Sequence, residues 1–248
     1  MTFCLAIKVE DGLVALADTR VVKGDERINK GKLEVLWHHG NPVFIMTSGL
    51  RSVRDKTMIY LIEQLEKRTS PHEKLYQIAN SFGEQLRLVR QEDGEALIQD
   101  GLTFNAHAII GGKLAADSEP SLFYIYPAGN WIEASKDSPY FIIGRTSYGR
   151  PILDSLLRHD LKLAMAVNLG FLAFDATRTS VIDVDFPLDI VTYHAEHGLN
   201  QQSYTQQEMH KTSNWWRQCL TEALEKMPMD WQQSPFTEHT PPPRELMP

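Results

Sequence analysis

Cysteine is scarce in this sequence, with only Cys4 and Cys219 among 248 residues. Two cysteines cannot build a disulfide framework, and no signal peptide is recognisable, so we expect a protein of the reducing cytoplasm. No apolar run reaches the roughly 18 residues needed to cross a bilayer, which excludes a membrane partner at this stage. Basic residues are outnumbered, 25 Lys and Arg against 32 Asp and Glu, and they form no stripe. A net charge of -7 therefore argues against nucleic acid as a partner.

The residues that are present are typical of a soluble globular domain. Hydrophobic residues make up 42% of the chain and charged residues 23%. We expect one domain over residues 1–226, long enough to bury a substantial core. Residues 227–248 have no apolar period and include Pro241-Pro242-Pro243, which predicts an extended or disordered tail.

The chain opens with a pattern of antiparallel strands. Thr2–Val9 alternates, which predicts a strand that buries its odd-numbered apolar residues. Asp11-Gly12 predicts a type I′ turn, with a returning strand at Leu13–Ala17. After a charged loop, a second hairpin is expected to pair Leu33–Trp37 with Val43–Met46.

Blocks of helical and strand patterns then alternate. Ser70-Pro71 is expected to supply the N-cap and first residue of the second helix. This order predicts the α+β class, with helix pairs covering the outer faces of stacked antiparallel sheets. The remaining elements are expected as helices near 58–65 and 75–89, strands at 103–110, 122–126 and 140–143, two helices within 151–175, strands at 180–184 and 189–193, and a last helix at 205–226.

Thr2 is the first candidate for chemistry, because it follows the initiator Met1. The small side chain of threonine favours removal of Met1, which would place a free α-amino group beside the hydroxyl. An amine with a pKa of about 7.7–8 can accept the hydroxyl proton near neutral pH. Thr2 would then supply both nucleophile and general base, although threonine is also a common second residue.

A nucleophile of this kind needs a cation to keep the amine neutral, a carboxylate to hold that cation, and an N–H for the oxyanion. Asp18 ends the second expected strand, where the hairpin returns it beside Thr2. Arg20 is two residues after Asp18, so its side chain is expected on the same side of an extended chain as that of Asp18. Lys32 begins the next strand. Gly49 ends the fourth strand just before a helix, where its amide is unobstructed.

These residues resemble the proteasome-type N-terminal-nucleophile hydrolases, and most closely the bacterial branch called Anbu, the proposed ancestral β-subunit. The resemblance covers roughly residues 2 to 225. It is carried by Met1-Thr2-Phe3-Cys4, by Lys8 two residues before an acidic turn, by Asp18-Thr19-Arg20, and by Ser147-Tyr148-Gly149-Arg150-Pro151-Ile152-Leu153-Asp154. The last segment distinguishes the branch, since common proteasome subunits have Gly-Ser-Gly there.

The resemblance implies a four-layer αββα sandwich that assembles into a ring or ring-like homo-oligomer. It implies peptides or unfolded proteins as substrates, with no metal and no organic cofactor. By position it makes Thr2 the nucleophile and base, Asp18 and Lys32 the pair that tunes the amine, and Gly49 the oxyanion donor. Arg20 would order the neighbouring loop.

The sequence also departs from the proteasome pattern. The loop before Lys32 is one residue shorter than usual, which leaves Lys30 as an alternative. Asp175 is followed by Arg178 where a hydroxyl usually supports the amine, so Thr177, Thr179 or Ser180 would have to supply it. In the Gly-Ser-Gly place stand Gly144, Arg145 and Thr146, which leaves Thr146 or Ser147 as partners of the amine.

Two other functions stay open from the sequence. One is a non-proteolytic assembly protein whose N-terminus is unprocessed, or whose site is blocked by Arg145 or Arg178. The other is an amidase or transamidase acting on small amides. His38-His39 and the segment His194-Ala195-Glu196-His197 suggest metal ligation, but neither has a third ligand at a recognisable metal-site spacing, so solvated loop histidines are expected there. Cys4 follows Thr2 in the alternating strand and is expected to face the opposite way from Thr2 and to pack in the core.

Overall fold

The structure is a computed structural model that describes residues 2–23, 26–29 and 31–228. It divides between Met209 and His210 into two compact units, which are described separately. In the described residues, no helix combines the length and apolarity that a membrane span requires. Most of the expected tail, and the alternative lysine Lys30, lie outside the described residues.

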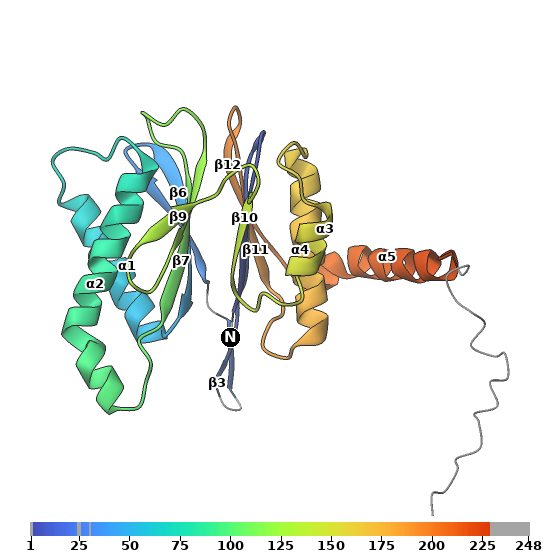
Figure 1. Cartoon of the computed structure of the whole chain (residues 1–248), viewed down its shortest axis with the longest axis horizontal. Helices are drawn as coiled ribbons and strands as arrows, with labels where there is room; N and C mark the ends of the chain where they lie inside the picture. Colours follow the sequence, from blue (N-terminus) through green and yellow to red (C-terminus); the bar gives the residue numbers. More distant parts are fainter. Residues whose placement is uncertain (1, 24–25, 30, 229–248) are drawn as a thin grey trace, which may run out of the picture. The chain divides into compact units, whose positions relative to one another are not determined.

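The first unit contains two five-stranded antiparallel sheets that lie face to face between two pairs of helices (Figure 1). The first sheet has the order β10 (Tyr140–Gly144), β1 (Phe3–Val9), β2 (Gly12–Asp18), β11 (Leu188–His194) and β12 (Gly198–Tyr204). The second has the order β5 (Leu33–His38), β6 (Asn41–Gly49), β7 (Ala106–Gly112), β8 (Ser121–Ile125) and β9 (Trp131–Glu133). A separate two-stranded sheet pairs β3 (Arg20–Lys23) with β4 (Glu26–Asn29).

Helices cover the outer face of each sheet (Figure 1). The second sheet is covered by α1 (Arg51–Glu66) and α2 (Leu75–Gln99), and the first by α3 (Arg150–Leu156) and α4 (Leu163–Ser180). The expected α+β class and four-layer αββα sandwich are confirmed. A fifth helix, α5 (Gln206–Glu225), runs into the second unit and exposes Trp215, Leu220 and Leu224.

The first sheet is covered on both faces at β1 and β2, which explains why every residue of these two strands is buried. Phe3 and Leu5 pack in the cluster that includes residues of α4, whereas Cys4 and Ala6 pack in the cluster between the two sheets. The expected core position of Cys4 is confirmed. Burial raises the pKa of its thiol to about 12, so the thiol stays protonated near neutral pH.

The expected type I′ turn after β1 is wrong in place and type. The register pairs Val9 with Gly12, so Glu10 and Asp11 are the central residues. His39 is the one described non-glycine residue with a positive φ, which rules out type I′ geometry at Glu10 and Asp11. That geometry instead fits the second hairpin, where His39 has φ 47° and Gly40 φ 81°.

Ser70-Pro71 does not start the second helix. The helix begins at Leu75, and the side chain of Gln77 accepts the N–H groups of Glu73 and Lys74. The N–H of Leu75 donates to Oδ2 of Asp117, a carboxylate 42 residues away. A tertiary contact therefore fixes this helix start, and a local capping signal could not reveal it.

The strand predictions also need correction. Ser180 is the last residue of α4, and Val181–Val184 forms the loop that follows, so the strand expected at 180–184 is wrong. The strands at Gly198–Tyr204 and Trp131–Glu133 were missed, because both are largely exposed edge strands without apolar alternation. The segment expected as a charged loop contains parts of β3 and β4.

Candidate active site

Asp18 lies at the end of β2 and connects the first strand to Lys32. Its Oδ1 accepts the backbone N–H of Phe3 at 2.7 Å and the Nζ of Lys32 at 2.7 Å. Asp18 is 0% exposed and Lys32 is 3% exposed, so water screens this ion pair little. The antiparallel hairpin and the start of β5 thus bring a buried carboxylate and a buried ammonium group to the residue that follows Thr2.

Burial is the main influence on the charge of Asp18. It raises the pKa of the carboxyl to about 6, although Lys32 and the Phe3 N–H favour the ionised form. Oδ2 of Asp18 is buried and has no hydrogen-bond partner in the described part of the chain. Lys32 therefore provides most of the compensation for this carboxylate, and removal of Lys32 would leave a costly buried charge.

Thr2 is buried at the start of β1, and strand β10 holds its backbone. The carbonyl of Thr2 accepts the N–H of Arg145 at 2.7 Å. Gly144 has φ 93°, and a Cβ added there would lie 1.8 Å from the Thr2 oxygen, so only glycine permits this approach. Cys4 and Ala6 face the space between the sheets. By alternation the side chain of Thr2 belongs to the same face, so the expectation that Cys4 faces the opposite way from Thr2 is wrong.

Gly49 ends β6 in a conformation that suits glycine alone. Its φ is 112°, and an added Cβ would lie 2.1 Å from the carbonyl oxygen of Asn105. The N–H of Thr47 donates to the Lys32 carbonyl at 3.1 Å, and the N–H of Leu50 donates to Asn105 on the other side. Because N–H directions alternate along a strand, the Gly49 N–H points toward the side of Lys32.

Arg20 links the Asp18–Lys32 pair to the loop after α4. Its carbonyl accepts the Nζ of Lys32 at 2.7 Å, so acceptors from both sides of the β2–β3 corner, Asp18 and Arg20, hold Lys32. The Nη1 of Arg20 lies 3.0 Å from Oδ2 of Asp185 and donates to the Ile182 carbonyl at 3.4 Å. These contacts fix the corner that presents an acceptor to Lys32.

Arg178 is held by the same loop. Its Nε donates to Oδ1 of Asp175 at 2.8 Å, and its Nη1 lies 3.9 Å from Oδ1 of Asp185. The guanidinium also lies 5.0 Å from the centre of the Phe186 ring. Two carboxylates and an aromatic face thus engage Arg178, and its charge is compensated at the end of α4.

Arg145 pairs with a second aspartate of this loop. Its Nη2 lies 3.1 Å from Oδ2 of Asp183, and its Nε donates to Oδ1 at 3.4 Å. Partial burial opposes the ionised form of Asp183, but the hydrogen bond and charge of Arg145 contribute to a pKa below the usual value. The backbone of Arg145 therefore holds Thr2 while its side chain is anchored by Asp183.

The candidate hydroxyls take different positions. Thr146 and Ser147 lie in the loop between β10 and α3, directly after Arg145, and the Thr146 carbonyl accepts the N–H of Arg150 at 3.1 Å. Three other hydroxyls donate to carbonyls of their own helix: Thr177 to Ala173 at 2.8 Å, Thr179 to Asp175 at 2.9 Å, and Ser180 to Ala176 at 2.8 Å.

Asp183 and Asp185 were missed by sequence reasoning. They flank the buried Val184, Asp183 within the segment 180–184 that was predicted as a strand and Asp185 directly after it, and no motif marks them. Four aspartates of β2, α4 and the loop after α4 each pair with a basic side chain: Asp18 with Lys32, Asp175 with Arg178, Asp183 with Arg145 and Asp185 with Arg20. Because each of these carboxylates already binds a basic side chain, the four aspartates are better suited to holding those side chains in place than to binding a metal ion.

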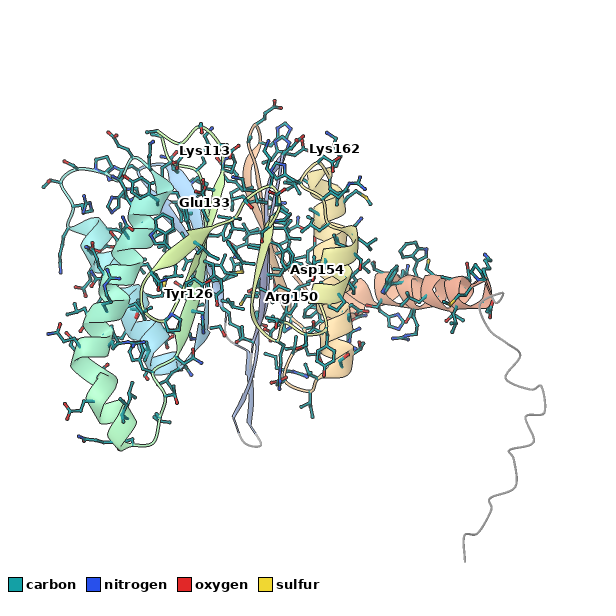
Figure 2. The ribbon with its side chains drawn as sticks, viewed as in Figure 1. Lys113, Tyr126, Glu133, Arg150, Asp154 and Lys162 are labelled. Atoms are coloured by element: carbon teal, nitrogen blue, oxygen red, sulfur yellow. The ribbon has the colours of Figure 1, made fainter. Side chains whose placement is uncertain are left out.

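A cavity of about 470 Å³ lies elsewhere in this unit. Its lining includes Tyr126 after β8 and, on α3, Arg150 and Asp154 (Figure 2). Neither Asp18 nor Lys32 lines it. This cavity is thus separate from the Asp18–Lys32 pair.

Comparison with known families and structures identifies close relatives of the fold. The sequence model of the family described as proteasome subunit matches residues 2–183. An Anbu (Gly-1) mutant from Hyphomicrobium sp. strain MC1 is 31% identical, with a TM-score of 0.83 over 92% of this chain and 98% of that one. Anbu from Yersinia bercovieri is 26% identical, with a TM-score of 0.82 over 92% and 98%.

A third structure, titled as the helical assembly of the Anbu complex from Pseudomonas aeruginosa, is 27% identical. Its TM-score is 0.83, over 92% of this chain and 97% of that one. The comparison with curated proteins gave no match.

Proposed function

This chain belongs to the proteasome subunit family and to its Anbu branch, and from that premise we propose that it is a threonine-type peptidase of the cytoplasm. The proposed substrates are peptides or unfolded protein segments, and the nucleophile is Thr2 after removal of Met1. The observation that carries the proposal is the buried Asp18–Lys32 pair, bonded to the N–H of the residue next to Thr2.

In the proposed reaction, the free amine of Thr2 accepts the proton of its own hydroxyl. The Oγ attacks the carbonyl carbon of the scissile amide, and the resulting oxyanion is stabilised by the N–H of Gly49. The protonated amine then gives its proton to the leaving amine, which leaves an ester on Thr2. Water hydrolyses the ester with the same amine as base, and the free carboxylic acid leaves.

Lys32 acts on this cycle through charge. A positive group near the amine disfavours the protonated amine, which keeps more of it neutral at pH 7. Asp18 holds Lys32 in place, and Arg20 presents the second acceptor. Arg145 and Arg178 occupy places where the family usually has hydroxyls, and their engagement by Asp183, Asp175 and Asp185 argues against either side chain acting as a free cation that blocks the site.

Removal of Met1 is the first test. With Met1 retained, the nitrogen of Thr2 is an amide and cannot accept a proton, so catalysis by Thr2 requires its loss. We expect intact mass spectrometry of untagged protein from its native cytoplasm to give the mass that lacks one methionine. Full retention of Met1 would exclude Thr2 catalysis in that material and would favour a non-proteolytic assembly protein.

Assembly is the second test. Ile59, Leu88 and Ile98 are exposed on the α1–α2 layer, and the relative from Pseudomonas aeruginosa is titled as a helical assembly. We therefore expect a large homo-oligomer, ring-like or helical, because apolar helix faces are stabilised by burial against other copies. Light scattering of the untagged chain measures this mass. A stable monomer of about 28 kDa at micromolar concentration would contradict assembly while leaving the chemistry of Thr2 open.

An amidase or transamidase acting on small amides remains the second candidate, since it would use the same Thr2, Asp18 and Lys32. A panel of peptides and small amides, assayed with the same processed and assembled protein, separates the two. Turnover of small amides without any peptide cleavage would favour the amidase.

A further inference from the structure

The hairpin between β11 and β12 brings together three side chains that can bind a metal ion, at the end of the first sheet opposite Thr2. The register pairs His194 with Gly198, so residues 195–197 form a tight loop. His194, Glu196 and His197 each offer a ligand atom, and these atoms all lie within 4.8 Å of one another. The carboxylate of Glu196 thus supplies the third ligand that sequence spacing alone did not reveal.

The loop is held in a shape that keeps the three side chains together. Gly198 has φ 73°, and the N–H of Ala195 donates to the Asp11 carbonyl at 3.4 Å, which joins this loop to the neighbouring β1–β2 turn. The rings of His194 and His197 stack with their centres 4.5 Å apart. The loop is therefore partly ordered before any ligand binds, which lowers the entropic cost of binding.

The hydrogen bonding of His194 also suits a cation. The N–H of Glu196 donates to Nδ1 of His194 at 3.1 Å, so this nitrogen presents a lone pair toward the loop. A metal ion can replace that donor and accept the same lone pair. Lys162, a basic side chain paired with the β1–β2 turn (labelled in Figure 2), lies 3.6 Å from Asp11 and is thereby engaged by another carboxylate.

We propose that His194, Glu196 and His197 form a binding site for a first-row transition metal of the Zn²⁺ class. Two imidazoles and one carboxylate are the donors of three-ligand zinc sites, and nitrogen donors favour such ions over Ca²⁺ and Mg²⁺. The three side chains are half-buried or exposed at the loop, so an ion reaches them without unfolding, and a fourth position stays open to water.

The site is separate from the proposed chemistry. Along β2 and β11, the pair Gly12–His194 lies six residue steps from the pair Asp18–Leu188, which at about 3.4 Å per residue corresponds to roughly 20 Å. Zn²⁺ here would stabilise the hairpin ends of the first sheet and would take no part in steps at Thr2. The proposal therefore does not depend on peptidase activity.

Calorimetry with ZnCl₂ and untagged protein tests the proposal. We expect saturable binding of one Zn²⁺ per subunit near pH 7.5, weaker binding near pH 5.5 because protons compete for imidazole, and a higher Tm with Zn²⁺. His197→Ala and Glu196→Gln should each weaken binding at least about tenfold. His210→Ala, which removes an exposed histidine of α5, should leave it unchanged.

Circular dichroism of the variants controls for folding, and the exposure of Glu196 and His197 favours intact folds. Equal Zn²⁺ affinity in the wild type, His197→Ala and Glu196→Gln would overturn the proposal. So would the absence of saturable binding by the folded wild type. A loss of binding in His210→Ala alone would assign the ion to α5 and would also overturn it.

Discussion

Peptide hydrolysis is expected to disappear when Thr2 is replaced by alanine. The change Thr2→Ala removes the hydroxyl that attacks the amide and leaves the α-amine, Asp18 and Lys32 in place. The loss should be at least about 10³-fold in kcat, because removal of a covalent nucleophile leaves only binding and oxyanion stabilisation. The measurement is turnover of a broad peptide library by processed, assembled protein, with light scattering to show that the assembly persists.

Thr2→Ser is the matched control, since serine keeps both the hydroxyl and the amine. It should retain a measurable part of the activity if Thr2 acts by nucleophilic attack. Unchanged hydrolysis by purified Thr2→Ala would place the nucleophile elsewhere. Inactivity of processed wild-type protein toward peptides and small amides would instead support a non-proteolytic assembly.

The second large effect is expected at Lys32. Lys32→Ala should lower kcat/KM by at least about 10²-fold, a typical scale for losing an electrostatic or acid–base contribution. It should also move the acid limb of the pH profile to higher pH. The reason is that the nearby positive charge lowers the pKa of the Thr2 amine, and its removal returns that pKa toward the model value of about 7.7–8.

Asp18 adds to the acid limb of the wild-type protein. Its pKa is raised to about 6, so the carboxyl takes up a proton as the pH falls through that value and loses its charge contact with Lys32. Two groups therefore contribute to the decline on the acid side. Both contributions should shift upward in Lys32→Ala, because Lys32 also favours the ionised form of Asp18.

Stability has to be measured beside activity, because Lys32→Ala leaves Asp18 buried without its partner. Breaking a buried pair of this kind costs about 3–5 kcal/mol. Lys8→Ala is a suitable control: Lys8 is also a buried lysine, paired with Glu119 at 2.9 Å, and it lies at the other end of β1. It should change Tm with little effect on kcat/KM. A fall in rate without any shift of the acid limb would make Lys32 a structural residue only.

The sequence predicted those parts of the site that depend on strand periodicity. The hairpin of β1 and β2 returns Asp18 to the start of the chain, and strand ends fix Lys32 and Gly49, so alternation was sufficient to bring these residues together. Their catalytic roles remain predictions. The order of the layers was also predicted, because helices and strands that bury one face repeat their apolar residues at a helical or strand period.

The parts that could not be predicted depend on contacts across the fold. Asp183 and Asp185 lie in a loop, and each is recognisable as part of the site only by its ion pair. Their partners, Arg145 and Arg20, are 38 and 165 residues away in sequence. The start of α2 depends on Asp117 rather than on the capping signal at Ser70. Loop carboxylates and long-range caps leave no periodic pattern, so local propensity gives no information about them.

The burial of Cys4 has a consequence for chemical labelling. A thiol with a pKa of about 12 is ionised to roughly one part in 10⁴ to 10⁵ near pH 7.5, and the side chain is also sealed between the sheets. Cys219 on α5 is half-exposed, and it is the only other cysteine in the chain. A maleimide dye therefore attaches to the folded wild-type protein at Cys219, and each subunit of an assembly can carry a single fluorophore without any engineered cysteine.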